Sequence, residues 1–455
     1  MSGNSLKIAA IVMSLTVFLG GCSSMASAKG IAESNKGTSA PSSNVNEIVS
    51  SEEIELSPSS DVVTSMPVSS ASSEPELELE PLSEPPQPEP EPEPRMTLTA
   101  ADIDEALAAA VEDYSAMAIS VAAIEDGHLS QSGAWGWASE NEREMTADTK
   151  MRLASLSKVI VGMCAMAMDE EGIVDIDAPI SDYWGDDVYN PYSQKQPSIR
   201  SFMTHTSSVM DLETTRGLSN LRNLIGGGSH WRSMEPGDGG YWYYSNFGIC
   251  VLGTTLELAS NQLLDDYFQS HFCEPLGIKA SFYSGNFDET ELATLYESGS
   301  VARSAAEQAQ TPLPTAIGDG ASYYPGGLTI SANDLAKLVA VLINKGTYED
   351  EELLSPESVE EMETAQFSVD PGESAVFDQC LILRRQENIL GQDVLYYHTG
   401  SAYGVYTLLT FNPETKNGVV VLTTGALRKT DDYGLYSICS SISQDLYSRM
   451  DKSAN

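Results

Sequence analysis

The strongest constraint on the fold is a set of strand-like segments at both ends of residues 98–455. Two apolar or alternating runs, 116–124 and 128–137, are joined by a Glu-Asp-Gly turn. Similar runs return near the C-terminus at 376–384, 393–398, 405–411 and 418–424. Helical periodicity occupies 100–114, much of the middle, and 433–447. Strands at both ends with helices between them predict an α+β fold, in which the terminal segments complete one antiparallel sheet.

Residues 1–22 have the features of a targeting signal. Lys7 precedes an apolar run from Ile8 to Leu19, which is short for a membrane-spanning helix and typical of a signal peptide. The run ends in Leu19-Gly20-Gly21-Cys22, which resembles a bacterial lipobox. We therefore expect lipidation of Cys22 and anchoring on the extracytoplasmic face of a bacterial cell membrane. The alternative is an ordinary secretory signal that is cleaved near residues 26–28.

Residues 23–97 are predicted to be a disordered linker. Serine dominates its first part, and alternating Glu and Pro dominate its second. Eleven of the 22 prolines of the chain lie between Pro41 and Pro94. Such a segment cannot bury enough apolar surface to offset the entropy lost on folding. Residues 98–455 are therefore expected to form a single globular domain.

Charge and motif content exclude several classes of function. The chain has 66 acidic against 24 basic residues, a net charge of -42, which argues against nucleic acid as a partner. The five histidines are scattered, and neither CxxC nor His-Glu-x-x-His occurs, so we expect no metal, no other cofactor and no disulfide framework. Cys164 and Cys250 fall in apolar helical patterns and are predicted to be buried. There is no Gly-x-Ser-x-Gly elbow and no phosphate-binding loop.

The first candidate for chemistry is Ser155-x-x-Lys158, the one Ser-x-x-Lys spacing among the 12 lysines. Apolar residues follow with helical spacing, so the two side chains lie one turn apart on one face. Ser155 would stand at a helix start, where backbone N–H groups favour a developing oxyanion. A desolvated Lys158 could take the proton of the serine. Ser157, the rival nucleophile, lacks a lysine three residues later.

Two further segments complete the set of candidates. Tyr244 and Asn246 stand two apart ahead of an apolar helix, where Tyr244 could relay a proton and Asn246 could bind an amide; helix capping is the competing interpretation. A third segment, His398, Thr399, Gly400 and Ser401, stands at the end of a predicted strand. There Gly400 would allow close approach of a substrate backbone, Thr399 could bind a carboxylate, and the Ser401 N–H could serve as an oxyanion donor.

Together these motifs resemble the penicillin-recognising serine hydrolases, which include class C β-lactamases, D-alanyl-D-alanine carboxypeptidases, D-aminopeptidases and esterases. That family has Ser-x-x-Lys, Tyr-x-Asn and Lys/His-Thr-Gly in this order. Segments 203–207 (Met-Thr-His-Thr-Ser) and 325–331 (Pro-Gly-Gly-Leu-Thr-Ile-Ser) match as well. The resemblance covers about residues 100–450. It implies a five-stranded antiparallel sheet flanked by helices, with a mainly helical subdomain.

The resemblance also implies an acyl-enzyme on Ser155, with Lys158 and Tyr244 moving protons and with Asn246, His398, Thr399, Gly400 and Ser401 around the substrate. Because His398 replaces the lysine usual in class C β-lactamases, we expect a D,D-carboxypeptidase-like hydrolase of cell-wall or D-amino-acid peptides. A β-lactamase or esterase, and a non-catalytic penicillin-binding or scaffold protein, are the alternatives. Arg384 or Arg385 is a weaker candidate for a carboxylate contact, and His205 is expected to hold a loop. The natural substrate and the oligomeric state stay open.

Overall fold

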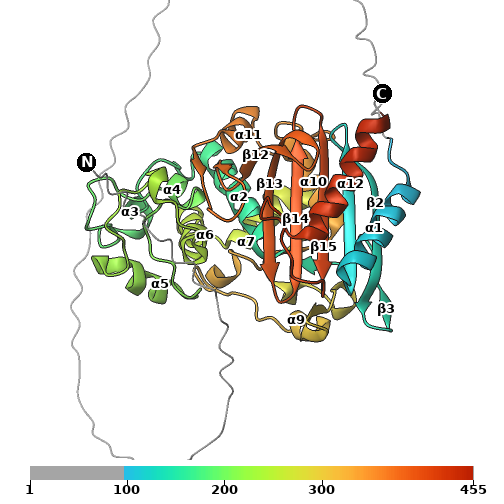
Figure 1. Cartoon of the computed structure of the whole chain (residues 1–455). Helices are drawn as coiled ribbons and strands as arrows, with labels where there is room; N and C mark the ends of the chain where they lie inside the picture. Colours follow the sequence, from blue (N-terminus) through green and yellow to red (C-terminus); the bar gives the residue numbers. More distant parts are fainter. Residues whose placement is uncertain (1–96, 454–455) are drawn as a thin grey trace, which may run out of the picture. The chain divides into compact units, whose positions relative to one another are not determined.

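A computed structural model describes residues 97–453 of the protein. The predicted signal peptide, Cys22 and all but the last residue of the predicted linker lie outside these residues. Within the described part, one antiparallel sheet has nine strands in the order β10-β11-β12-β13-β14-β15-β1-β2-β3, with helices on both faces (Figure 1). This confirms the α+β prediction. The predicted number of five strands is wrong, because the sheet continues at both edges.

The elements have the following bounds. The strands of the main sheet are β1 (Ala118–Glu125), β2 (His128–Ser139), β3 (Arg143–Glu144), β10 (Phe367–Val369), β11 (Phe377–Gln379), β12 (Arg384–Ile389), β13 (Gln392–Ala402), β14 (Val405–Asn412) and β15 (Asn417–Thr424). Short strands pair separately: β4 (Met151–Arg152) with β7 (Thr329–Ile330), β5 (Leu295–Glu297) with β6 (Ser300–Arg303), and β8 (Thr347–Tyr348) with β9 (Glu351–Glu352).

The α-helices are α1 (Ala100–Tyr114), α2 (Ser157–Glu170), α3 (Ser181–Trp184), α4 (Ile199–Met203), α5 (Leu218–Ile225), α6 (Asn246–Ser260), α7 (Leu264–Phe268), α8 (Glu274–Leu276), α9 (Ala305–Ala309), α10 (Ala332–Ile343), α11 (Pro356–Glu363) and α12 (Ser437–Ser453). Single turns occur at η1 (Ala154–Leu156), η2 (Gly226–Gly228), η3 (Gly239–Tyr241), η4 (Gln269–Cys273), η5 (Ser284–Asn286), η6 (Glu289–Glu291) and η7 (Ala321–Tyr323).

The two ends of the domain meet in the middle of the sheet. β1 pairs with β15 from Ala118 opposite Thr424 to Ile124 opposite Gly418, as the prediction of a sheet closed by terminal segments requires. All eight residues of β1 are buried. Because side chains alternate between faces, Ile119, Val121 and Ala123 pack with α1 and α12, while Ala118, Ala122 and Ile124 join the core of α2 and α10. Figure 1 shows α1 and α12 side by side over one face of the sheet.

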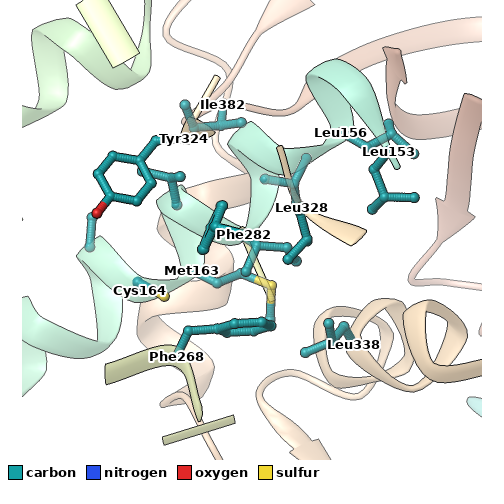
Figure 2. Packing of buried hydrophobic residues seen from close by; sticks show 14 of the residues in the cluster. Leu153, Leu156, Met163, Cys164, Phe268, Phe282, Tyr324, Leu328, Leu338 and Ile382 are labelled. Carbon is teal, nitrogen blue, oxygen red and sulfur yellow. The ribbon is translucent and has the colours of Figure 1, made fainter. Parts of the chain in front are cut away.

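Helix α2 is the central helix of the core that it shares with α10. Residues 157–168 of this helix are all buried, as is typical of a helix that is apolar all round. Figure 2 shows Met163 and Cys164 of α2 among Phe268, Phe282 and Leu338, which come from distant parts of the chain. Cys164 and Cys250 are buried free thiols, and their predicted burial is thus confirmed. The start of α2 is therefore held rigidly from several sides.

Two predicted boundaries are wrong. The strand predicted over 376–384 is interrupted, because the chain turns between β11 and β12 with Ile382 at a φ of 63°. There Ile382 is fully buried, and its N–H bonds the Met203 carbonyl at 3.0 Å. The last helix begins four residues after the predicted position 433. Its predicted start is a turn in which the Asp431 side chain accepts the N–H groups of Tyr433 and Leu435.

No helix in residues 97–453 combines the length and the apolar character that a membrane span needs.

Candidate active site

Ser155 lies in the single turn η1, which leads directly into α2. Its neighbour Ala154 has a φ of 51°, a left-handed conformation that is unfavourable for a residue with a side chain. The flanking peptide groups are held by long-range bonds. The Leu153 N–H bonds the Leu328 carbonyl at 2.7 Å, and the Leu153 carbonyl accepts the Thr407 hydroxyl at 2.8 Å. These contacts fix the turn that presents Ser155.

Lys158 connects three parts of the chain. Its fully buried side chain places Nζ 3.1 Å from Ser155 Oγ, 2.8 Å from Asn246 Oδ1 and 2.7 Å from the Pro325 carbonyl. The three partner oxygens therefore surround Nζ within hydrogen-bonding distance. Among the described residues no carboxylate forms an ion pair with Lys158. The lysine is thus aimed at the serine hydroxyl.

The second motif both caps a helix and reaches the lysine. Ser245 is the N-cap of α6, where its hydroxyl accepts the Gly248 N–H at 2.8 Å and donates to Asp211 at 2.9 Å. Asn246 begins the helix and accepts from Lys158. The Tyr244 ring centroid lies 4.9 Å from Lys158 Nζ. The capping and the chemical interpretations of this segment are therefore compatible.

The third motif lies on β13, which continues to Ala402, four residues beyond its predicted end. Gly400 is pressed against the turn Ala154–Leu156, called the nucleophile turn below after the role predicted for Ser155: a Cβ there would lie 2.3 Å from the Leu153 carbonyl oxygen and 3.1 Å from the Ser155 nitrogen. The close approach of strand and turn therefore requires glycine at this position. This contact places Ser401, the next residue, at the same edge as Ser155.

The register of β13 shows which backbone groups are open. Tyr403 and Gly404 both have positive φ, so the hairpin to β14 has a two-residue turn of type I′, flanked by a hydrogen-bonded pair. Because backbone N–H groups alternate in direction along a strand, the N–H groups of Thr399 and Ser401 point away from β14. Pairing with β12 ends at Tyr397, and no other strand in the described residues pairs with this edge. The N–H groups of Ser155 and Ser401 can therefore face one oxyanion.

Two buried histidines border the site. Burial, aided by the charges of Arg384 and Lys158, lowers the pKa of His398 well below its usual value. The neutral ring donates from Nδ1 to the Thr399 carbonyl at 2.8 Å. Burial likewise lowers the pKa of His205, whose ring lies 4.5 Å from that of Tyr244. The His205 carbonyl accepts the Tyr243 N–H at 3.0 Å, so this residue holds the loop, as expected.

The remaining sequence candidates have other partners. Ser157 donates to the Ala154 carbonyl at 2.7 Å and accepts the Leu328 N–H at 3.0 Å, which gives this hydroxyl a structural role. Arg385 is paired with Asp378 at 3.0 Å and with Glu387 at 2.9 Å. Arg384 stacks on Phe377, with 4.5 Å between its guanidinium carbon and the ring centroid.

Three contributors to the site were not foreseen from the sequence: the Pro325 carbonyl, the Thr407 hydroxyl and the Asp211 carboxylate. Asp211 accepts the Phe247 N–H at 3.0 Å as well as the Ser245 hydroxyl. The Pro-Gly-Gly segment that contains Pro325 was recognised as a motif, but the role of its carbonyl was not. In the described residues no cluster of three or more His, Cys, Asp or Glu side chains could hold a metal ion.

Comparisons with known proteins find a matching family and relatives with partial coverage. A family model described as beta-lactamase matches residues 103–438. The chain is 30% identical to esterase EstB of Burkholderia gladioli over 164 residues, 31% of this chain and 40% of that protein. It spans less than half the length of the curated relatives that it matches.

Two solved structures illustrate the shared fold. A class C β-lactamase from Rhodobacter sphaeroides has a TM-score of 0.59 at 19% identity, over 78% of this chain and 99% of that chain. The D-alanine carboxypeptidase AmpC from Burkholderia cenocepacia has a TM-score of 0.59 at 17% identity, over 77% and 98%.

Proposed function

Because this chain belongs to the beta-lactamase family, a family of serine hydrolases, we propose that it forms an acyl-enzyme on Ser155 and releases a terminal D-amino acid from small cell-wall-type peptides. One observation carries the proposal. Lys158 Nζ bonds Ser155 Oγ at 3.1 Å and is held in place by Asn246 and Pro325. A nucleophile with a positioned base in hydrogen-bonding range is the arrangement that covalent catalysis needs.

Acylation transfers one proton and breaks one bond. Ser155 Oγ attacks the substrate carbonyl carbon, while Lys158 Nζ or the Tyr244 hydroxyl takes the hydroxyl proton. The resulting oxyanion accepts hydrogen bonds from the N–H groups of Ser155 and Ser401. When the C–N bond breaks, the proton taken from Ser155 is returned through Tyr244 to the departing amine. Water then attacks the ester, releases the acid and restores the serine hydroxyl.

The open edge of β13 supports a peptide substrate. An extended peptide that pairs antiparallel with residues 399–401 has its C-terminal end at Thr399 and its scissile carbonyl at Ser401. Thr399 would bind the terminal carboxylate, and Asn246 would bind the peptide amide. The neutral, buried ring of His398 donates a hydrogen bond to the carbonyl of Thr399, the residue that follows it.

A peptidase is favoured over a β-lactamase by His398 at the position where class C β-lactamases usually have lysine. The D-alanine carboxypeptidase that shares the fold is consistent with this assignment. An esterase is the second candidate, because esterase EstB is 30% identical over 164 residues.

The test is the intact mass of the protein after incubation with a fluorescent penicillin. We expect an adduct of one acyl group on the wild type and none on Ser155→Ala. Ser270→Ala is the matched control, because it removes an exposed serine hydroxyl outside the candidate site and should still be labelled. A label that survives in Ser155→Ala would overturn the assignment of the nucleophile.

Specificity is tested by release of D-alanine from diacetyl-Lys-D-Ala-D-Ala. We expect release by the wild type and none by Ser155→Ala. Hydrolysis of p-nitrophenyl esters or nitrocefin without any D-alanine release would replace the peptidase by an esterase or a β-lactamase.

We also propose that the protein is a lipoprotein on the extracytoplasmic face of the membrane. The support is the lipobox-like Leu19-Gly20-Gly21-Cys22 behind an apolar run. Expression in a bacterial host should give a membrane-associated protein, and Cys22→Ala should release it or leave it unprocessed. Equal membrane association of both proteins would contradict the proposal.

A further inference from the structure

One cavity of the domain is rich in arginine, and its lining includes Arg152, three residues before Ser155. It has a volume of about 490 Å³, and its lining includes Arg152, Arg216 and Arg303. Glu307 is the one acidic residue in that lining. Since the whole chain has 24 basic and 66 acidic residues, three arginines around one cavity are a marked local reversal of charge.

Two of these arginines share one aromatic ring. The guanidinium carbons of Arg152 and Arg303 each lie 5.1 Å from the ring centroid of Tyr403. Burial, and to a smaller extent the charge of Arg303, lowers the pKa of Arg152. Two like charges that contact the same ring repel each other, so the arrangement favours a bound counter-charge.

In the described residues the counter-charge is only partial: the charge of Arg303 contributes to the lowered pKa of Glu307, but no carboxylate forms an ion pair with the cavity arginines. Elsewhere Arg200, Arg222, Arg385 and Arg449 are paired with carboxylates. No ion pair of Arg152, Arg216 or Arg303 occurs among the described residues. In Arg152, Nε donates to the Gly326 carbonyl at 2.6 Å, and its terminal amino groups have no hydrogen-bond partner among the described residues.

The nearby Glu307 has another role. It is the N3 residue of a capping box at the start of α9, where its carboxylate accepts the Ser304 N–H at 2.9 Å. This backbone hydrogen bond is the main reason that the pKa of Glu307 is lowered. The carboxylate is therefore engaged in holding the start of a helix.

The position of the cavity relates it to one side of a substrate. Arg152 precedes Ser155 by three residues, and Tyr403 follows Ser401 by two at the tip of the hairpin. In the proposed binding mode the departing residue lies at Thr399 and the scissile carbonyl at Ser401. The acyl part of the substrate then extends along β13 toward Tyr403 and the arginines.

We propose that this cavity is a subsite for a carboxylate on the acyl part of the substrate, bound by Arg152 and Arg303 with Arg216 at its rim. The planar guanidinium group matches a carboxylate with two parallel hydrogen bonds. The inference deepens the proposed function, since the direction of the acyl part rests on it. It narrows the substrates to peptides or esters whose acyl group is acidic.

Binding of two acyl-amino acids of equal length provides the test. N-glutaryl-D-alanine and N-pentanoyl-D-alanine differ only in a terminal carboxylate against a methyl group. We measure their binding to Ser155→Ala by calorimetry, which requires no turnover and therefore reports on the subsite independently of catalysis. The glutaryl compound should bind about tenfold to a hundredfold more tightly, the range of charge-assisted hydrogen bonds.

Arginine variants in the same background assign the preference. Arg303→Gln changes an exposed side chain and should reduce the preference to less than threefold, and Arg303→Lys should restore part of it. Arg428→Gln removes an equal charge from an exposed residue that does not line the cavity, and it should leave the preference unchanged. Equal binding of the two compounds to the parent, or an equal loss in Arg428→Gln and Arg303→Gln, would overturn the subsite.

Catalysis separates this inference from the proposed function. The corresponding thioesters, S-glutaryl- and S-pentanoyl-thioglycolate, in which thioglycolate replaces D-alanine as the leaving group, should differ in kcat/KM in the same direction as the binding. Hydrolysis of both at equal rates, with equal binding, would refute the subsite and leave the acyl-enzyme intact. A binding preference in a protein that is never acylated would refute the enzyme and leave the subsite.

Discussion

Gly400→Ala tests whether contact between β13 and the nucleophile turn sets the geometry of the site. A methyl group at this position would lie 2.3 Å from both the Leu153 carbonyl oxygen and Thr407 Oγ1. Ordinary contact begins near 3.4 Å, so strand and turn must separate by about 1 Å. That separation also stretches the 2.8 Å bond between Thr407 and Leu153.

Both activity and stability should fall, for different reasons. A displacement of about 1 Å at a reacting group reduces the rate by about 100-fold. Insertion of a methyl group into a tightly packed region costs about 1–3 kcal/mol of unfolding free energy. We expect the second-order acylation rate with a fluorescent penicillin to fall about 100-fold, while thermal unfolding still shows a folded protein.

Two variants sharpen the result. Gly226→Ala is the matched control, because Gly226 has a φ of -75° and a Cβ there would meet its nearest atoms at 3.6 Å. Adding Thr407→Ala to Gly400→Ala removes one clash and leaves the one with the Leu153 carbonyl, so rescue should be partial at most. If Gly400→Ala is acylated within threefold of the wild-type rate at unchanged stability, the steric reasoning is wrong.

Three further predictions concern Asn246, Glu257 and His398. Asn246→Asp would place a carboxylate where Lys158 Nζ now bonds an amide oxygen at 2.8 Å. Because an adjacent carboxylate favours the ammonium form of the lysine, acylation should slow more than 100-fold with little change in melting temperature. A near wild-type rate would exclude Lys158 as the base. Burial raises the pKa of Glu257 from 4.5 to about 7. The folded protein therefore retains a proton that the unfolded chain loses, and the free energy of unfolding should fall by about 3 kcal/mol as pH rises from 4.5 to 7. Denaturant titrations at pH 5 and 8 should show this difference in the wild type and not in Glu257→Gln. The same change of unfolding free energy with pH in both proteins would contradict it. Since burial lowers the pKa of His398, nitrogen NMR should find its ring neutral from pH 8 to 5.5, whereas titration near 6.5 would place the ring in solvent.

The main features of the fold were predictable where burial is continuous. β1, β14 and β15 are fully or almost fully buried strands, and such strands appear in the sequence as apolar runs. The outermost strands gave no comparable signal. β3 has two residues and β10 has three, too few for a period to show, whereas β11 falls inside the run 376–384 that was predicted as one strand. The five strands that the family resemblance implied are therefore too few at both edges.

The interrupted strand at 376–384 shows a different limit. Its residues favour a strand locally, yet Ile382 adopts a left-handed conformation. Its side chain lies against Gly162 of α2, where an added Cβ would be only 2.9 Å from Ile382 Cγ1. Tertiary packing around α2 thus overrides the local preference. Sequence position alone gives no sign of this contact.

Ser155 and Lys158 were candidates from their spacing of one helical turn, and the full set of site residues was predicted from the resemblance of three motifs to a known family. The same reasoning could not find the Pro325 carbonyl or the Thr407 hydroxyl. Both act on residues more than 160 positions away in the chain, and backbone acceptors have no signature in side-chain type. The roles of the predicted residues stay predictions until the labelling experiment is done.

The conformation of Ala154 links the site to the assembly of the whole domain. A left-handed alanine is unfavourable by about 1–2 kcal/mol, so its neighbours must hold it. The Leu328 carbonyl, the Thr407 hydroxyl and the Ser157 hydroxyl do so from the loop after η7, from β14 and from α2. Since β14 belongs to the sheet and α2 to the core beside it, the nucleophile turn gains its geometry only when both have packed together. Acylation of Ser155 should therefore report native packing across the domain more sensitively than helix content does.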